Sequence, residues 1–440
     1  MRGIALPASS SHLPLYVFYQ YHKLFVMVCV ALLGTCDTKL EELLFLRNVI
    51  REANVEVALM DVGRSSTNHE AITILQKDLL NNHTEEEDLI ERERGDVIKI
   101  MAECATKAVK SLYEEGKIQG VIAAGGSGGT SIAASAMRDG LPIGFPKLIV
   151  STIASGDTGP IVGETDITLM YSVVDVAGLN QVLKEVLSNA GRAMAGMASA
   201  FFSRKLQQTS PSTQKRVGIT MFGVTTPAVD EIRKHLEANY NIETFVFHAT
   251  GHGGKAMERL IREGRLDAVL DLTTTELCDH ITGGVMSAGP NRLEAAATAG
   301  IPNIISVGAT DMTNFGPMST VPERYKSRKL YEHNPVVTLM RTSQEEAAQV
   351  GEFIVSKLRS HTKNPSMVQV WLPKGGISMI ATPDGPFADR EADIVLFQTI
   401  KEGLAQSGIE VVEDERSIND AGFAHAIAEA LVSKLTPSRR

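Results

Sequence analysis

Apolar runs and helically spaced segments alternate along the chain from residue 28 onward. Residues 28–33 form a continuous apolar run, which is typical of a strand buried on both faces. A glycine-containing turn follows, and residues 39–53 then place leucine and valine along one side of a helix. Residues 55–60 form the next strand-like run. This order of strand, turn, helix and strand predicts a βαβ unit with parallel strands.

The same order returns in the second half of the chain. We predict a strand at 216–221, a helix at 229–239 and a strand at 242–247. The helix has a start signal, because Thr226 can cap it and Pro227 suits the first helical position. The repetition indicates two related Rossmann-like halves, with a chance match as the alternative because βαβ units are common.

Further strands and helices complete the pattern of the second half. A capping box at residues 343–346 opens one predicted helix. Two strands are predicted before this helix, at 268–272 and 303–307, and strand and helix alternate after it, at 368–372, 394–404, 409–413 and 423–435. We therefore predict an α/β fold made of two Rossmann-like, three-layer αβα subdomains with mainly parallel sheets.

The polar segment 207–215 separates the two halves, since it contains Pro211 and can form neither a core helix nor a core strand. We predict a first domain at 27–206 and a second at 216–440. Residues 1–26 are expected to be a disordered extension, with a targeting segment as the alternative. His22 and Lys23 interrupt the apolar stretch there, so we expect no membrane span.

Composition narrows the possible functions. The chain has 440 residues, 43% of them hydrophobic and 22% charged, which is ordinary for a globular protein. Its net charge of −9 argues against nucleic-acid binding, which needs clustered Lys and Arg. The acidic segment 84–96 is interpreted as a solvated helix surface. Four scattered cysteines without a C-x-x-C pair favour a reducing, cytoplasmic location and no structural metal site: Cys29, Cys36, Cys104 and Cys278.

A glycine-rich loop is the strongest local signal in the sequence. The predicted strand 121–124 runs into four glycines within five positions, and a small-residue helix is predicted at 131–137. Glycines let backbone amides converge on one point, and a helix N-terminus adds partial positive charge. The loop therefore predicts a cradle for phosphate, with a tightly packed turn as the alternative. Its residues are Gly125, Gly126, Ser127, Gly128, Gly129 and Thr130.

Two other loops are expected beside this cradle, because the carboxyl ends of parallel strands lie at one edge of a sheet. The turn from Gly34 through Thr38 contains Asp37, which could hold a hydroxyl or a magnesium-bound water, and Lys39 could meet a phosphate. A simple helix cap is the alternative role for Asp37. Ser155 lies in the third loop, which follows the predicted strand 147–150.

The second half offers its own candidate site. His248 is followed by a turn that could hold an anionic group, formed by Gly251, Gly253 and Gly254. Asp271 and Glu276 follow the next strand and are candidates for acid–base work with His248. The alternatives are a strand-end histidine with structural partners and carboxylates that anchor loops. A metal site is not expected here.

These motifs, taken in order, resemble the family of the tomato mosaic virus resistance protein's N-terminal inhibitory domain, a Tm-one-like ATP-binding domain of uncharacterised protein family 0261. The resemblance covers residues 27–435 and implies two Rossmann-like subdomains, nucleotide binding and a homodimer. In the plant protein a TIM-barrel-like half follows this region, so a separate TIM-barrel-like partner is expected. The motifs are LLGTCDTK, GGSGGT, LPIGFPKLIVSTIASGD, GITMFGVTTP, FHATGHGGKAME, DLTTTE, HNPVVTLMRT and SIND-GFA.

Three functions remain open on this basis. The leading hypothesis is a nucleotide-binding protein that takes ATP, with or without Mg²⁺, or another phosphate-bearing small molecule. The second is an enzyme that acts on a small carboxylate or phosphorylated metabolite between the two domains. The third is a non-catalytic interaction protein whose glycine loops are structural. Neither nucleic acid nor membrane is an expected partner in any of them.

Overall fold

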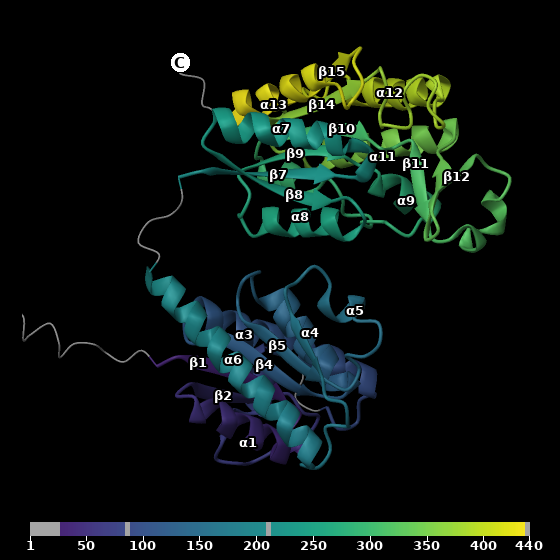
Figure 1. Ribbon diagram of the computed structural model, residues 1–440. Coiled ribbons are helices and arrows are strands. Elements are labelled where there is room, and N and C mark those ends of the chain that lie inside the picture. Colours follow the sequence, from purple (N-terminus) through teal and green to yellow (C-terminus); the bar gives the residue numbers. More distant parts are fainter. Residues whose placement is uncertain (1–26, 84–88, 208–212, 436–440) are drawn as a thin grey trace, which may run out of the picture. The chain divides into compact units, whose positions relative to one another are not determined.

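The computed structural model describes residues 27–83, 89–207 and 213–435 (Figure 1). The chain divides into two compact units, residues 1–209 and 210–440. The extension expected to be disordered, residues 1–26, lies outside the described residues. None of the helices in the described ranges has the length and apolar character needed to cross a bilayer.

The first unit contains a six-stranded sheet in which every strand pairing is parallel. The strand order is β3-β2-β1-β4-β5-β6. This is the order of a Rossmann fold, and it reverses direction between β1 and β4. The strands are β1 (Cys29–Gly34), β2 (Glu56–Asp61), β3 (Ile72–Ile74), β4 (Gly120–Gly125), β5 (Lys147–Ser151) and β6 (Thr168–Tyr171).

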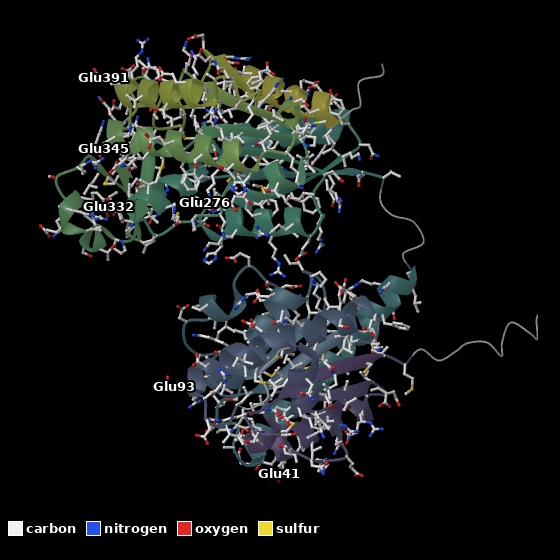
Figure 2. All side chains as sticks on the ribbon, turned by 180° about the vertical axis from the view of Figure 1, so that it is seen from behind. Glu41, Glu93, Glu276, Glu332, Glu345 and Glu391 are labelled. Carbon is white, nitrogen blue, oxygen red and sulfur yellow. The ribbon has the colours of Figure 1, made fainter. Side chains whose placement is uncertain are left out.

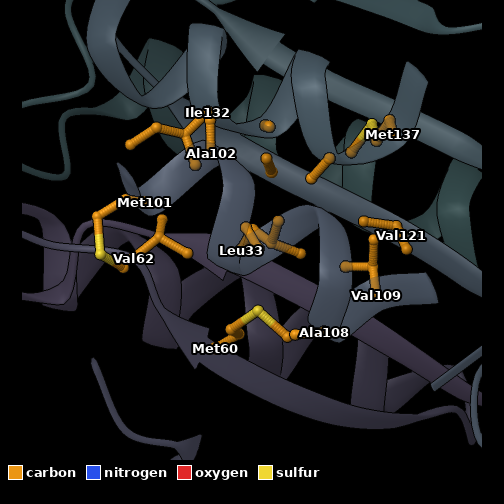
Figure 3. Packing of buried hydrophobic residues seen from close by; sticks show 14 of the residues in the cluster. Leu33, Met60, Val62, Met101, Ala102, Ala108, Val109, Val121, Ile132 and Met137 are labelled. Carbon is orange, nitrogen blue, oxygen red and sulfur yellow. The ribbon is translucent and has the colours of Figure 1, made fainter. Parts of the chain in front are cut away.

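Helices cover both faces of this sheet, because successive residues of a strand point to opposite sides. Leu33 packs in one core with Met101 and Ile132 (Figure 3), whereas Leu32 packs in the other with Leu43. The first core lies under α3 and α4, and the second under α1 and α6. The helices are α1 (Cys36–Glu52), α2 (Gln76–His83), α3 (Arg94–Glu114), α4 (Ser127–Gly140), α5 (Gly159–Val162) and α6 (Gln181–Gln207).

The second unit also has a parallel six-stranded sheet, in the order β15-β14-β10-β9-β7-β8. Its strands are β7 (Lys215–Met221), β8 (Ile242–His248), β9 (Ala268–Thr273), β10 (Asn303–Gly308), β14 (Val368–Pro373) and β15 (Glu410–Asp414). A small antiparallel sheet, which the sequence did not predict, is inserted between β10 and β14. It consists of β11 (Met312–Phe315), β12 (Leu330–Asn334) and β13 (Val337–Arg341).

Helices again cover both faces of the large sheet, with α7 and α13 over one core and α11 and α12 over another. The predicted capping box is confirmed, since the Ser343 hydroxyl accepts from the Glu346 backbone N–H and the Glu346 carboxylate accepts from the Ser343 N–H. The α/β fold class with two three-layer units is therefore confirmed. The helices are α7 (Thr226–Asn239), α8 (His252–Arg262), α9 (Glu276–Thr282), α10 (Ala295–Ala299), α11 (Gln344–His361), α12 (Arg390–Leu404) and α13 (Ala421–Leu435), with short 3-10 helices η1 (Gly223–Thr225), η2 (Met318–Thr320), η3 (Glu323–Tyr325) and η4 (Pro365–Met367).

Candidate functional site

A cavity of about 630 Å³ lies in the first unit, at the carboxyl ends of β1 and β4. These are the two strands between which the strand order reverses, the usual position of a ligand crevice in an open parallel sheet. The loop after β1 lines the cavity with Asp37, Thr38 and Lys39, and the loop after β4 lines it with residues 126–129. The loop after β5 reaches the cavity through Thr152, so the structure brings together all three loops that the sequence places at this edge.

Both of these loops lead directly into helices. Helix α4 begins at Ser127, four residues before its predicted start, because Gly128 and Gly129 take part in its first turn. Helix α1 begins at Cys36, and its backbone kinks at Lys39, where the sequence pattern predicted the start. The first-turn N–H groups of a helix have no acceptor within the helix and carry partial positive charge. The N-termini of both helices therefore lie at the cavity, although at α1 the N–H groups of Cys36, Thr38 and Lys39 already donate to Asp61 and to the Thr35 carbonyl.

The glycines of the α4 loop leave space on the cavity side. A Cβ atom built on Gly129 would meet no heavy atom within 4 Å, and one on Gly126 would meet only Thr152 Oγ1, at 3.8 Å. One on Gly128 would come within 3.4 Å of Ile98 Cδ1. Close packing therefore does not explain the glycine at 129 or at 126. Their missing side chains instead expose the backbone amides to the cavity.

Three cationic side chains line the cavity, namely Lys39, Arg64 and Arg94. The carboxylate of Asp37 accepts hydrogen bonds from the backbone N–H groups of Arg64 at 3.0 Å and Ser65 at 3.1 Å. Asp37 therefore fastens the loop after β2 to the start of α1, and the N-cap position of α1 belongs to Thr35. The sequence patterns did not indicate Arg64 and Arg94, because neither lies in one of the loops that the sequence places at the cradle.

Not every predicted residue of this site faces the cavity. The Thr130 hydroxyl is buried and hydrogen-bonds to the Ser151 hydroxyl at 2.7 Å, so it braces the loop from below. Gly34 and Gly125 are the last residues of β1 and β4 and are buried beneath the loops. Ser155 lies in an exposed turn beyond the cavity, and Thr152 is the residue of that loop which lines it.

A buried carboxylate supports the site from behind. Asp61 ends β2 without solvent exposure, and it accepts hydrogen bonds from the N–H groups of Cys36 at 3.1 Å, Gly63 at 2.9 Å and Thr67 at 3.1 Å. Burial raises the pKa of Asp61, while these three donors oppose that rise. Asp61 therefore holds the start of α1 against the loop after β2.

The glycine turn of the second unit holds an anionic group of its own chain. Glu276 Oε1 accepts from the N–H groups of Gly251 at 2.7 Å and Gly254 at 3.0 Å. A Cβ atom on Gly253 would lie 1.9 Å from the His248 carbonyl oxygen, so close packing requires that glycine. Glu276 lies inside the unit, whereas Glu332 and Glu345 lie at its surface (Figure 2).

Arg292 joins the two predicted catalytic carboxylates. Its Nε donates to Glu276 Oε2 at 2.8 Å, and its Nη2 donates to Asp271 Oδ1 at 2.7 Å. Glu258 is a third partner, and burial raises the pKa of Glu258 while the positive charge of Arg292 opposes the rise. Arg292 and Glu276 have no exposed side-chain surface, and that of Asp271 is 3% exposed. These carboxylates are therefore in structural ion pairs.

His248 is exposed at the end of β8 and contacts the ring of Phe222, with the centroids 5.6 Å apart. It has no hydrogen bond to Glu276, whose oxygens face Arg292 and the glycine turn. Among the described residues, no group of three or more His, Cys, Asp or Glu side chains is arranged to hold a metal ion. The structure thus brings Asp271 and Glu276 together but leaves His248 apart from them.

Comparison with known proteins gives relatives that extend over most of the chain. A "UPF0261 protein" of Clostridium tetani is 45% identical over 408 residues, which is 92% of this chain and 98% of that protein. The "ToMV resistance protein Tm-1" of Solanum lycopersicum is 41% identical over 428 residues, 93% of this chain and 56% of that protein. A solved UDP-N-acetylglucosamine 2-epimerase from Rickettsia bellii has 10% identity and a TM-score of 0.21, covering 63% of this chain and 78% of that one. A likeness that low says nothing about ligands.

Family models match both units. The "Uncharacterised protein family (UPF0261) N-terminal domain" matches residues 28–203, and the C-terminal domain of the same family matches residues 214–435. The resemblance stated from the sequence motifs is thereby confirmed. The chain belongs to the UPF0261 family.

Proposed function

We propose that the first unit binds a nucleotide, ATP, with its phosphates above the glycine loop 126–129. One observation carries the proposal. The N-termini of α1 and α4 meet at the reversal point of the sheet, and the cavity there is lined by Lys39, Arg64 and Arg94. Helix N-termini and cationic side chains are the two kinds of group that proteins commonly use to bind phosphate.

The cavity walls suit the two parts of a nucleotide. The phosphates would accept hydrogen bonds from the α4 amides and from the hydroxyls of Ser127 and Thr38, and they would meet the charge of Lys39. Arg94 opens α3 and lies close to the loop, since a Cβ atom on Gly128 would be 3.6 Å from its Nη2. An apolar wall formed by Val62, Val97, Ile98 and Ile132 offers a surface for the base.

The geometry of the second unit does not favour acid–base catalysis by His248, Asp271 and Glu276. Both carboxylates are tied to Arg292, and an imidazole without a carboxylate partner has nothing to orient it for proton transfer. The proposal is therefore one of nucleotide binding, without a reaction. The homodimer, the TIM-barrel-like partner and the cytoplasmic location stay predictions.

Thermal unfolding of the full chain with different ligands tests the proposal. ATP at a hundredfold excess over its dissociation constant should stabilise the fold by about 2.7 kcal/mol, because binding to the native state alone shifts the equilibrium. GTP, NAD and phosphorylated carboxylic acids serve as comparisons. Stabilisation by a phosphorylated acid without any effect of nucleotides would support the metabolite alternative and contradict the proposal.

A further inference from the structure

A second cavity, of about 190 Å³, lies wholly within the second unit at the carboxyl edge of its sheet. The loop after β7 forms one wall with Phe222 and Val224, and His248 lies at the end of β8. The hairpin β12–β13 of the inserted sheet forms the opposite wall with Val337 and Leu339. No residue of the first unit takes part in it.

The size and the lining of this cavity suit one flat apolar ring. A cavity of about 150 Å³ lined by apolar side chains is enough to hold benzene. Phe222, Val224, Met286 and Leu339 supply an apolar lining of this kind, and the Phe222 ring already packs at a tilt against His248. A larger ligand such as a nucleotide would not fit.

The polar groups along the cavity favour a negatively charged substituent on that ring. His248 and His333 are both exposed side chains that line it, and no carboxylate does so. Asn334 Oδ1 already accepts from the Val336 N–H at 2.9 Å, so its amide NH₂ is the part that can meet a ligand. Imidazole N–H and amide N–H groups are hydrogen-bond donors, and a carboxylate can accept from both.

Gly223 leaves space in the wall of the cavity. A Cβ atom built on it would meet no heavy atom within 4 Å, and its φ is not in the positive region, so neither packing nor backbone conformation requires glycine there. We propose that the second unit binds the ring of a small aromatic carboxylate in this cavity, with the carboxylate toward His248 and His333. This site is separate from the proposed nucleotide site and does not depend on it.

Calorimetric titration of the full chain with benzoate, nicotinate and 4-hydroxybenzoate tests the site. At least one should bind with saturation, whereas acetate, which lacks the ring, should bind at least about tenfold more weakly. Gly223→Leu should abolish binding, because Gly223 lines the cavity and a Cβ atom there meets no heavy atom within 4 Å, so the larger side chain would take up the space of the ring. His248→Leu, which removes the hydrogen-bond donor, should weaken carboxylate binding about tenfold and leave benzyl alcohol binding unchanged.

Three controls separate loss of binding from loss of folding. Trp371 is the single tryptophan of the chain and lies in β14, so its fluorescence shows whether the second unit of each variant is folded. Gly223→Val is the milder replacement if Gly223→Leu does not fold. Gly129→Val, in the first unit, should leave benzoate binding unchanged. The proposal is overturned if none of the three acids saturates, or if folded Gly223→Leu binds them like the wild type. If none of the three acids binds with saturation, the alternative occupant of the cavity is an apolar side chain of a partner protein.

Discussion

Arg292 and Glu276 form an ion pair in which neither side chain has any exposed surface, with Nε donating to Oε2 at 2.8 Å. The other carboxylate oxygen, Oε1, accepts from two amides of the glycine turn, at Gly251 and Gly254. This turn therefore already holds an anion, that of Glu276. The glycine loop of the first unit faces a cavity instead, and this difference separates a structural glycine turn from a candidate ligand site.

The first prediction concerns the buried ion pairs. Arg292→Met should destabilise the second unit by about 3–5 kcal/mol, because three carboxylates would remain buried without their shared cation. Urea unfolding followed by Trp371 fluorescence measures this loss, since the only tryptophan lies in that unit. Arg262→Met, at an exposed position of α8, is the matched control and should change stability by no more than about 0.5 kcal/mol. Equal stability of the two variants would contradict the structural role of Arg292.

The second prediction concerns pH. Burial raises the pKa of Asp279 from 3.8 to about 7, although Asn314 and Met286 donate backbone hydrogen bonds to it. A carboxyl whose pKa is higher in the folded state keeps its proton there, so stability is lost as the pH rises from about 4 to about 7. The contribution of this one group has a slope of at most about 1.4 kcal/mol per pH unit.

Asp279→Asn should therefore flatten the pH dependence of unfolding between pH 4 and 7, measured by the same fluorescence method. Asp230→Asn, at an exposed position of α7, should keep the wild-type slope. A slope that is identical in the wild type and in Asp279→Asn would show that this carboxyl does not titrate in that range.

The third prediction concerns the cationic side chains of the first cavity. Lys39→Met and Arg94→Met should each weaken ATP binding by about 10- to 100-fold, because each removes a charge-assisted contact worth about 1.5–3 kcal/mol. Adenosine, which has no phosphates, should bind equally to the wild type and to both variants. Lys99→Met is the control, because Lys99 is an exposed residue of α3 that does not line the cavity. If Lys39→Met and Arg94→Met weakened adenosine binding as much as ATP binding, these side chains would not contact the phosphates.

Much of the fold could be predicted from residue patterns. The buried strands are continuous apolar runs, and Ser343 with Glu346 mark the start of α11 as expected. The inserted sheet was not predicted, because its strands are short and do not form continuous apolar runs. They contain buried polar residues such as Thr313, Asn314 and Thr338. Pairings between short strands depend on contacts that a local pattern does not contain.

The candidate site was predictable in part. Gly126 and Lys39 each follow the carboxyl end of a parallel strand. Because these ends lie at one edge of the sheet, both residues line the same cavity. Arg94 belongs to the segment interpreted as a solvated helix surface, and only the packing of α3 against α4 brings it to the loop. The ion pair of Glu276 could not be predicted either, because its partner Arg292 is 16 residues away in the sequence and belongs to no recognisable motif.

The ATP dissociation constant of Gly129→Val, compared with that of the wild type, is the most direct test of nucleotide binding at the glycine loop. Gly129 lines the cavity and a Cβ atom there meets no heavy atom within 4 Å, so we expect a valine side chain to stand between the phosphates and the α4 amides. We predict a loss of affinity of about 100-fold or more, since at least two charge-assisted hydrogen bonds would be lost. Gly196→Val, at an exposed position of α6 with similar free space, should bind ATP like the wild type. Wild-type affinity in a folded Gly129→Val variant would contradict the account.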